Sequence, residues 1–145
     1  MVAILVYTET AEVQFLYPLP FLNNTMKRVV TIDFDETLAT EKSTGWGKSL
    51  VPYQTILDLI TKEHKQGSEI HIVSFRSEKE RPEVERFVRM YNLPIKSIVC
   101  TNLQSKTPYL LKLSSNLHVD DMKFALDDAK EAGIETLHFK EGKFI

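Results

Sequence analysis

Residues 29–38, which read VVTIDFDETL, decide the fold class of this chain. The segment opens with four consecutive apolar or β-branched residues and then turns acidic at Asp33 and Asp35. A continuous run of this kind, without polar alternation, is typical of a strand that is buried on both faces of a parallel sheet. The two carboxylates therefore come at the carboxyl end of a strand, where α/β proteins place their functional groups.

Further strands and helices alternate regularly along the chain after this segment. Strands are predicted over residues 70–74, 98–100, 117–120 and 135–139, and helices over residues 52–66, 81–91, 107–113 and 122–132. Parallel strands that are joined by right-handed helical crossovers produce this alternation. We therefore expect an α/β protein with a three-layer, Rossmann-like fold and a mainly parallel five-stranded sheet.

Length and composition narrow the class of protein. The chain has 145 residues, which is the size of one domain, and its 43% of hydrophobic residues can build a core, which argues against disorder. The formal net charge is −2, whereas proteins that bind long nucleic-acid tracts are usually basic. A single cysteine, Cys100, fits a reducing compartment, and the apolar run at residues 2–7 is too short to span a bilayer. We therefore expect a soluble, cytoplasmic protein.

The chain changes character at residues 18–28, where two prolines and a pair of asparagines interrupt regular structure. Residues 1–25 are therefore predicted to be an N-terminal extension, whose two short apolar runs could pair as a hairpin. Residues 26–145 are predicted to be the regular domain, and Met26 is an alternative start of the chain. The extension is also a candidate for joining copies of the protein into a homo-oligomer.

Polar side chains gather where the predicted strands end, together with a lysine that opens the helix before the fourth strand. The residues concerned are Asp33, Asp35, Ser74, Arg76, Lys106, Asp120 and Asp121. Carboxylates that meet at one edge of a sheet repel one another unless a cation, a proton or a basic side chain compensates them. A hard divalent cation with oxygen ligands is the simplest compensation, and Mg²⁺ is typically held by a few carboxylates and the phosphate of a substrate.

In chain order, these residues match the four motifs of the haloacid dehalogenase (HAD) superfamily. The first motif, Asp-x-Asp-x-Thr after a buried strand, is present at residues 33–37, which read DFDET. Ser74 fits the hydroxyl of the second motif, Lys106 the lysine of the third, and residues 120–121 the acidic pair of the fourth. The chain resembles this superfamily over residues 28–140, and the combination of the first and fourth motifs at strand ends is the most specific part of the match.

The resemblance implies a phosphatase that forms an aspartyl-phosphate intermediate. Asp33 would be the nucleophile and Asp35 the general acid and base. The side chains of Asp33 and Asp120 and the backbone carbonyl of Asp35 would hold Mg²⁺. Asp121 would be either a further metal ligand or the partner that orients Lys106. Family members that attack carbon lack the second aspartate of the first motif, so Asp35 points to phosphoryl transfer.

Four further residues are expected around the phosphate. Ser74 would donate a hydrogen bond to a phosphate oxygen, and Lys106 would offset charge on the phosphate and on the nucleophile. Thr37 would brace the loop of the first motif beside the substrate. Arg76 lies two residues past Ser74 and would reach the substrate from the same strand end.

Several of these residues have competitors. Lys112 lies on the same short helix as Lys106, which we prefer because a helix entrance lies closer to the strand ends. His71 and His118 lie inside predicted strands and are interpreted as packed or hydrogen-bonded side chains. Residues 127–128 are two aspartates that we assign to the exposed face of a helix.

The chain leaves little room for a cap domain. Residues 38–51 are the whole connection between the first motif and the next helix, so we expect a capless site. The loop over residues 41–48 is expected to be a flexible cover of that site. Within it, Trp46 is flanked by glycines, and it could either stack on a base of the substrate or pack on its own loop.

The capless layout and the segment at residues 74–76, Ser-Phe-Arg, are also similar, though more weakly, to the 3′-phosphatase domain of phage-type polynucleotide kinases. We therefore expect a Mg²⁺-dependent phosphomonoester hydrolase whose favoured substrate is a nucleotide or a nucleic-acid 3′-phosphate. A phosphosugar or phosphoprotein phosphatase is the alternative within the same chemistry. A non-catalytic binding or assembly module is the alternative from a different class.

Overall fold

The structure is a computed structural model that describes residues 27–145. The predictions for residues 1–25, namely the hairpin and the homo-oligomer contact, lie outside the described residues, and so does Met26. Within residues 27–145, no helix is both long and apolar enough to cross a bilayer.

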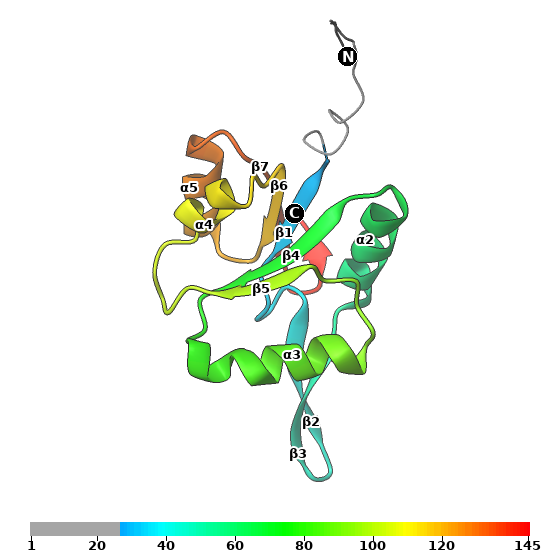
Figure 1. Ribbon diagram of the computed structural model, residues 1–145. Helices are drawn as coiled ribbons and strands as arrows, with labels where there is room; N and C mark the ends of the chain where they lie inside the picture. Colours follow the sequence, from blue (N-terminus) through cyan, green and yellow to red (C-terminus); the bar gives the residue numbers. More distant parts are fainter. Residues whose placement is uncertain (1–26) are drawn as a thin grey trace, which may run out of the picture.

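A six-stranded sheet with the order β5-β4-β1-β6-β7-β8 forms the centre of the molecule (Figure 1). Its strands are β1 (Val29–Ile32), β4 (Glu69–Ser74), β5 (Ser97–Cys100), β6 (Leu117–Asp120), β7 (Glu135–Lys140) and β8 (Lys143–Phe144). The first five pair in parallel, which confirms the predicted parallel sheet of five strands. The chain leaves β1 toward β4 and β5 and later returns to its other side at β6, so β1 lies at the switch point of the strand order, where α/β proteins bind ligands.

Four helices cover the two faces of this sheet and complete three layers (Figure 1). They are α2 (Gln54–Lys65), α3 (Arg81–Met90), α4 (Thr107–Lys112) and α5 (Lys123–Glu131), with a short 3₁₀ helix, η1 (Glu78–Glu80), before α3. On one face, α2 and α3 pack on the sheet through Ile56, Ile60 and Phe87. On the other face, α4 and α5 contribute Leu110 and Ala129 to a smaller cluster. The predicted Rossmann-like fold is therefore confirmed.

A strand at the C-terminal end was not predicted. Strand β8 is only two residues long and pairs antiparallel with β7, with Phe139 opposite Phe144. Gly142 makes the reversal possible because its φ of 87° lies in the left-handed region that favours glycine. A strand of this length carries no alternation that a sequence pattern could reveal, so the sheet has one strand more than expected.

A second correction concerns the expected flexible loop over residues 41–48. These residues belong to an antiparallel hairpin of β2 (Ala39–Thr44) and β3 (Gly47–Pro52), which projects from the body of the molecule (Figure 1). Most of the hairpin is exposed on both faces, so it lacks the apolar alternation that identifies a half-buried strand. Because β3 extends to Pro52, helix α2 begins at Gln54 and not at the proline.

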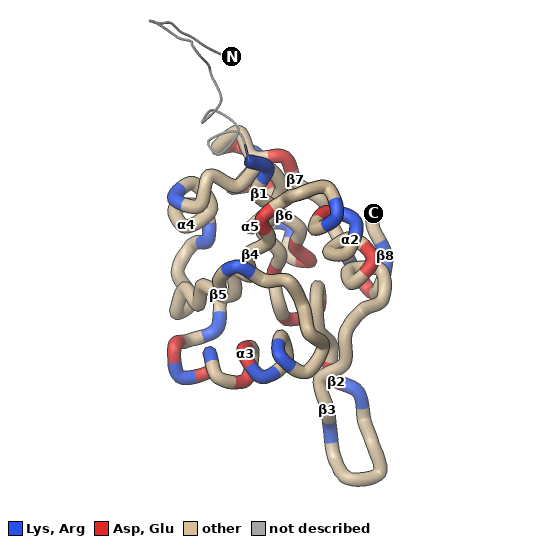
Figure 2. Tube along the Cα trace, turned by 45° about the vertical axis from the view of Figure 1, so that its right-hand side comes forward, with Lys and Arg blue, Asp and Glu red and all other residues tan. Residues whose placement is uncertain are grey.

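Charges of both signs are interspersed along the chain, and α3 carries Lys or Arg and Asp or Glu side by side (Figure 2). This mixture agrees with the formal net charge of −2. In agreement with this mixture, the sequence of residues 27–145 contains no long run of basic residues.

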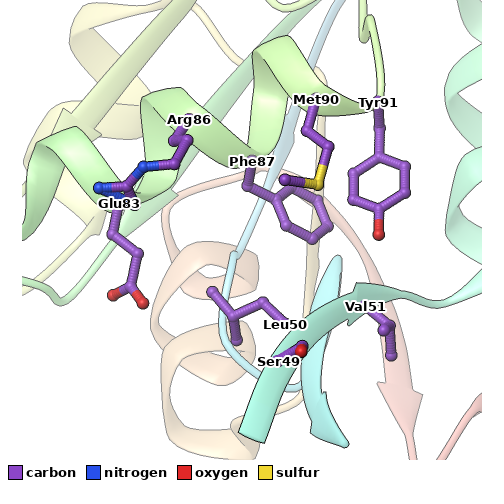
Figure 3. A pocket seen from close by; sticks show the side chains of 8 residues that line it. All are labelled: Ser49, Leu50, Val51, Glu83, Arg86, Phe87, Met90 and Tyr91. Carbon is purple, nitrogen blue, oxygen red and sulfur yellow. The ribbon is translucent and has the colours of Figure 1, made fainter. Parts of the chain in front are cut away.

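The hairpin and α3 border a groove of about 420 Å³ (Figure 3). Its walls are Leu50 and Val51 from β3 and Phe87, Met90 and Tyr91 from the α3 side. Glu83 and Arg86 lie at its rim. None of the acidic residues of the four motifs lines this groove, so the hairpin groove is separate from the site described next.

Candidate active site

The loop that follows β1 is held rigidly by two buried anchors. Phe34 and Leu38 are fully buried, and the Phe34 ring packs edge-on against Phe87 of α3 with a centroid distance of 5.2 Å. The N–H groups of Leu38 and Ala39 both donate to the Phe34 carbonyl, at 3.0 and 2.9 Å. Glu36 adopts a left-handed φ of 60° in this tight turn, a conformation that costs energy for a non-glycine residue. The loop thereby presents Asp33 and Asp35 at the end of the central strand.

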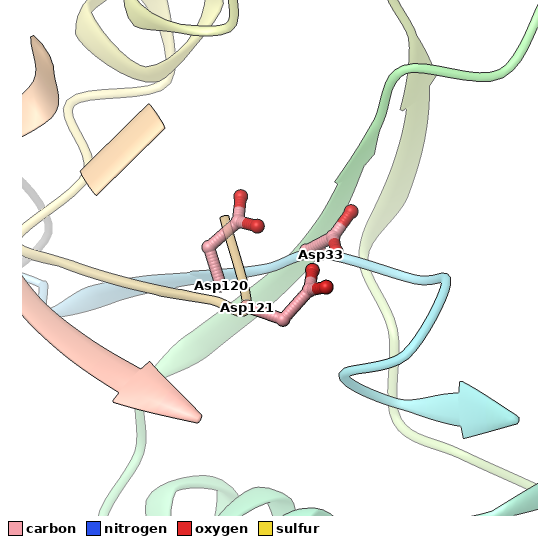
Figure 4. Close-up of side chains that lie close together, drawn as sticks. All are labelled: Asp33, Asp120 and Asp121. Atoms are coloured by element: carbon pink, nitrogen blue, oxygen red, sulfur yellow. The ribbon is translucent and has the colours of Figure 1, made fainter. Parts of the chain in front are cut away.

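Three aspartates meet at the carboxyl ends of β1 and β6 (Figure 4). Asp33, Asp120 and Asp121 each offer one carboxylate oxygen, and these oxygens all lie within 4.8 Å of one another. Asp33 and Asp120 are buried, whereas Asp121 is partly exposed. The two strands are neighbours in the sheet, and the N–H of Asp33 donates to the Val119 carbonyl at 2.9 Å, which fixes their relative position.

Lys106 lies between two of these carboxylates. It immediately precedes α4, and its Nζ donates to Asp33 Oδ1 and to Asp120 Oδ2, both at 2.7 Å. The lysine is 2% exposed. Lys112, the competitor, is exposed at the other end of α4. The alternative in which Asp121 orients Lys106 is not what the structure shows, since Asp120 occupies that position.

The charges of this cluster shift several pKa values. Burial lowers the pKa of Lys106, but the attraction of Asp33 and Asp120 outweighs it, so the lysine pKa is raised. Burial raises the pKa of Asp33 well above its usual range, with help from the neighbouring Asp120 charge and against the pull of Lys106. Burial also raises the pKa of Asp121, again with a contribution from Asp120. For Asp120, burial is outweighed by the hydrogen bond of His118 and the charge of Lys106, which lower its pKa.

His118 forms a second layer behind the carboxylates. It is fully buried, its Nε2 lies 2.8 Å from Asp120 Oδ2, and its Nδ1 lies 2.8 Å from Thr31 Oγ1. Thr31 Oγ1 in turn lies 2.8 Å from Ser115 Oγ. Burial lowers the pKa of His118, so the ring contributes no positive charge at neutral pH. The sequence interpretation of His118 as a hydrogen-bonded strand residue is confirmed, but its link to Asp120 was missed.

Thr37 and Ser74 are both buried beside the cluster. The hydroxyl of Thr37 lies 3.1 Å from Asp33 Oδ2 and 3.4 Å from Asp121 Oδ1, so it braces two of the three carboxylates. Ser74 ends β4 next to β1, and its Oγ accepts a hydrogen bond from the N–H of Arg76 at 3.1 Å.

Asp35 is separated from this cluster and pairs with Arg76. The guanidinium donates from Nε and Nη2 to the two oxygens of Asp35, both at 2.9 Å, which is the two-pronged geometry that planar guanidinium groups favour. Its Nη1 also binds Glu83 of α3. These contacts raise the pKa of Arg76. The sequence placed Arg76 on the substrate, whereas here its guanidinium is engaged by two carboxylates and holds Asp35 in place.

Other sequence candidates lie away from the carboxylates. Trp46 occupies the turn of the β2–β3 hairpin and is 99% exposed, so the alternative in which it packs on its own loop is wrong. Asp127 and Asp128 lie on the exposed face of α5, as interpreted from the sequence. Asp128 accepts hydrogen bonds from the Ser105 and Thr107 hydroxyls, which tie α5 to the start of α4.

Sequence reasoning also missed the residues that form the rim of the site. Phe75 follows Ser74, and its ring lies under the Lys106 ammonium at 4.5 Å. Asn102 and Leu103 follow β5 and lie beside Phe75 and Arg76 in a cavity that includes Asp35. The position of residues 102–103 after a strand end was a possible signal, because loops at this edge of a parallel sheet border the ligand site.

Comparison with known proteins supports the fold. No protein-family model matches the chain, and the search of curated proteins finds no match. Among solved structures, a chain of the Pnkp1/Rnl/Hen1 complex superposes with a TM-score of 0.64 at 16% identity, over 81% of this chain and 47% of that one. The present chain therefore spans about half the length of that neighbour.

A second neighbour is the 3-deoxy-D-manno-octulosonate 8-phosphate phosphatase from Moraxella catarrhalis, in complex with a magnesium ion, a phosphate ion and KDO. Its TM-score is 0.51 at 18% identity, over 78% of this chain and 68% of that one. The two likenesses agree with the resemblance expected from the motifs, and they confirm the fold class that it implied.

Proposed function

We propose that the protein is a Mg²⁺-dependent phosphomonoester hydrolase that acts through an aspartyl-phosphate. One observation carries this proposal: the Asp33 carboxylate lies at the end of the central strand, is held by Lys106 beside Asp120 and Asp121, and is followed two residues later by Asp35. This is the arrangement that in-line attack by a carboxylate on phosphorus requires, with a nucleophile, charge compensation and a second carboxyl group close by.

In the first step, an Asp33 oxygen attacks phosphorus and forms a new O–P bond. The bond between phosphorus and the leaving oxygen breaks, and the electron pair stays on that oxygen, which takes a proton from Asp35. In the second step, water gives a proton to Asp35 and attacks phosphorus, the bond to Asp33 breaks, and inorganic phosphate leaves. Arg76 fixes the orientation of the Asp35 carboxylate, which is the form that accepts the proton of water in the second step.

The residues of the cluster fit a divalent cation. Three carboxyl groups face one ammonium group, so the cluster holds more acidic groups than its single lysine can compensate. Burial, together with the charge of Asp120, raises the pKa values of Asp33 and Asp121, and a bound cation would favour their ionised forms. Asp33, Asp120 and the backbone carbonyl of Asp35 would hold the ion, with Asp121 as a further ligand. When bound, Mg²⁺ would offset the charge that develops on the phosphoryl oxygens.

Two other side chains would act on the phosphoryl group. Lys106 already lies 2.7 Å from Asp33 and would offset negative charge on both the nucleophile and the phosphate. Ser74, at the end of the adjacent strand, would donate its hydroxyl to a phosphate oxygen. Thr37 would keep the Asp33 carboxylate aligned through the contact that the structure shows.

The favoured substrate is a nucleotide or a nucleic-acid 3′-phosphate. The segment at residues 74–76 and the fold likeness to a chain of the Pnkp1/Rnl/Hen1 complex support this class. A phosphosugar is the second candidate, because the other structural neighbour is a sugar-phosphate phosphatase. Between the first motif and α2, the described residues contain only the β2–β3 hairpin. In either case, this hairpin is therefore all that could cover the site from that segment.

The decisive test is phosphate release from a generic aryl phosphate, with and without Mg²⁺. The wild-type protein should release phosphate only with Mg²⁺, and Asp33→Asn should abolish release because the amide cannot act as the nucleophile. Asp127→Asn, on the exposed face of α5, is the matched control and should keep full activity. An inactive wild type would instead favour a non-catalytic binding module, and full activity of Asp33→Asn would show that Asp33 is not the nucleophile.

Metal binding can be measured separately from turnover. Mg²⁺ that binds only the folded protein should raise the melting temperature, by an amount that grows with its concentration. Asp121→Asn removes one negative charge from the cluster without disturbing the contact between Lys106 and Asp33, and it should weaken this stabilisation. An equal shift in the wild type and in Asp33→Asn/Asp121→Asn would place the metal elsewhere.

A further inference from the structure

A cavity of about 480 Å³ opens directly beside Asp35, the residue assigned to protonate the leaving group. This volume lies in the range of cavities that hold one small organic ligand. The residues that line it are Asp35, Phe75, Arg76, Ser77, Glu80, Asn102 and Leu103. Because Asp35 must contact the leaving oxygen, this cavity is the place where the rest of the leaving group would lie.

The loop that carries Leu103 into this cavity has a strained backbone. Leu103 is 83% exposed, and its φ of 67° lies in the left-handed region that favours glycine, which has no side chain. Asn102, the residue before it, is also left-handed, with a φ of 55°. Residues held in sparsely populated backbone regions gather at ligand sites, and this strained pair of residues lines the cavity beside Asp35.

The same loop is fixed and not free to collapse. The N–H of Leu103 donates to the Phe75 carbonyl at 2.9 Å, and the N–H of Asn102 donates to the Arg76 carbonyl at 3.1 Å. On the other side, the Phe75 ring stacks on Phe124 of α5 with a centroid distance of 5.9 Å and an angle of 17° between the rings. Because Phe124 and the Lys106 ammonium both contact the Phe75 ring, the ring is fixed in place, and with Leu103 it forms a preformed apolar wall of the cavity.

The charges around the cavity limit what else the ligand can carry. Within the part of the chain that the structure describes, Arg76 is the single cation of the lining, and Asp35 and Glu83 already engage it. Glu80 adds a further carboxylate. A second phosphate group in this cavity would meet carboxylates and no free cation, so a polyanionic leaving group is disfavoured there.

From this we infer that the cavity is the leaving-group subsite and that it takes a single nucleoside, with its base against Phe75 and Leu103 and no additional phosphate. Asn102 Oδ1 already accepts from the Glu78 N–H and the Ser77 hydroxyl donates to Glu80, both at 3.1 Å, so the Nδ2 group of Asn102 is the donor that this wall offers to the edge of the base. The inference rests on the proposed phosphatase function and sharpens it, because it assigns the site to mononucleotides in preference to nucleic-acid ends.

The test compares kcat/KM for four substrates: adenosine 3′-monophosphate, a 3′-phosphorylated oligodeoxynucleotide, ribose 5-phosphate and phosphotyrosine. The mononucleotide should exceed each of the others by about tenfold or more, the size of the discrimination that a few apolar contacts provide. Leu103→Asn suits the left-handed backbone and removes the apolar contact. It should raise KM for the mononucleotide about tenfold and leave KM for ribose 5-phosphate unchanged.

Leu111→Asn, at an exposed leucine of α4 outside the cavity, is the matched control and should change neither value. Equal or better turnover of the oligonucleotide, or of phosphotyrosine, would overturn the inference while leaving the phosphatase function intact. The same holds if Leu103→Asn affects both small substrates alike. If no phosphate ester is hydrolysed at all, the proposed function falls and the inference falls with it.

Discussion

Lys106 is the residue on which both the folding and the chemistry of the cluster depend. It is buried, and it donates to two carboxylates that are themselves buried. A buried charge pair adds little net stability compared with an apolar replacement, but the loss of one partner leaves the other charge uncompensated. The lysine therefore holds together a group of aspartates that would otherwise resist burial.

Lys106→Met should consequently lower the free energy of unfolding by about 3–5 kcal/mol at neutral pH, because Asp33 and Asp120 lose their shared cation. Denaturant unfolding monitored by circular dichroism measures this loss. Lys112→Met, at the exposed lysine of the same helix, should change stability by no more than about 0.5 kcal/mol. A loss of similar size in the two variants would contradict the assigned role of Lys106.

At the scale of single residues, the sequence predicts the carboxylates of the site better than the side chains that contact them. Asp33 and Asp120 are recognisable because each ends an apolar strand, and parallel strand ends meet at one edge. The His118 contact was also within reach, since residues two apart on a strand point to the same face, and His118 and Asp120 satisfy that spacing. The pairing of Arg76 with Asp35 could not be predicted, because the two residues are 41 positions apart and no sequence pattern links them.

Among the elements, the β2–β3 hairpin shows where pattern reading fails. Its strands carry mostly polar residues on both faces, and they are stabilised by backbone pairing and by contacts at the base. Glu36 provides one such contact, since its carboxylate accepts hydrogen bonds from Thr40 Oγ1 at 3.0 Å and from the Tyr53 hydroxyl at 3.1 Å. These contacts depend on the folded motif loop, so a local propensity argument cannot find them.

Trp46 at the hairpin turn makes a clear prediction. Because the side chain is almost fully exposed, Trp46→Ala should change the free energy of unfolding by less than about 0.5 kcal/mol. It should also leave KM for adenosine 3′-monophosphate unchanged, since Trp46 does not line the cavity beside Asp35. Steady-state kinetics and thermal unfolding test both statements. A destabilised variant would show that Trp46 packs within the fold, and a raised KM for an oligonucleotide alone would support base stacking at the turn.

Helix α2 is tied to the start of the sheet by an ion pair that should respond to pH. Burial alone would raise the pKa of Glu63, but hydrogen bonds from Ser68 at 2.6 Å and from Arg28 at 3.1 Å outweigh it and lower that pKa. A carboxyl group with a lowered folded-state pKa stabilises the protein above the ordinary glutamate pKa of about 4.3, and this contribution is lost as the pH falls through the lower value.

Glu63→Gln should therefore cost about 1–2 kcal/mol at pH 7 and less near pH 3, because the contribution of the wild-type carboxylate declines as the pH falls toward its lowered pKa. Urea unfolding at the two pH values measures the difference. Glu131→Gln, an exposed residue of α5, should show no such pH dependence. A constant difference between wild type and Glu63→Gln at both pH values would mean that the ion pair does not stabilise α2.

For the whole molecule, the parallel sheet and its helices were predictable because every layer repeats one simple pattern. Five apolar strands alternate with amphipathic helices, and a buried sheet that is covered on both faces leaves few other arrangements. The exceptions are the short pieces at the edges, namely the hairpin and β8, whose pairing depends on neighbours and not on burial.

The mixed charge of the whole molecule leads to a prediction about salt. A protein that neutralises six to ten phosphates loses roughly 10³–10⁵ in nucleic-acid affinity between about 50 and 200 mM salt. Here the formal net charge is −2, charges of both signs are interspersed, and the substrate cavity offers no free cation among the described residues (Figure 2).

A terminal phosphate held by Lys106 and Mg²⁺ would involve only one or two contacts. We therefore expect KM for a 3′-phosphorylated oligonucleotide to change by less than about tenfold over this range. Initial-rate kinetics at matched Mg²⁺ concentration measure it, and a rise of a hundredfold or more would show that the protein grips an extended strand.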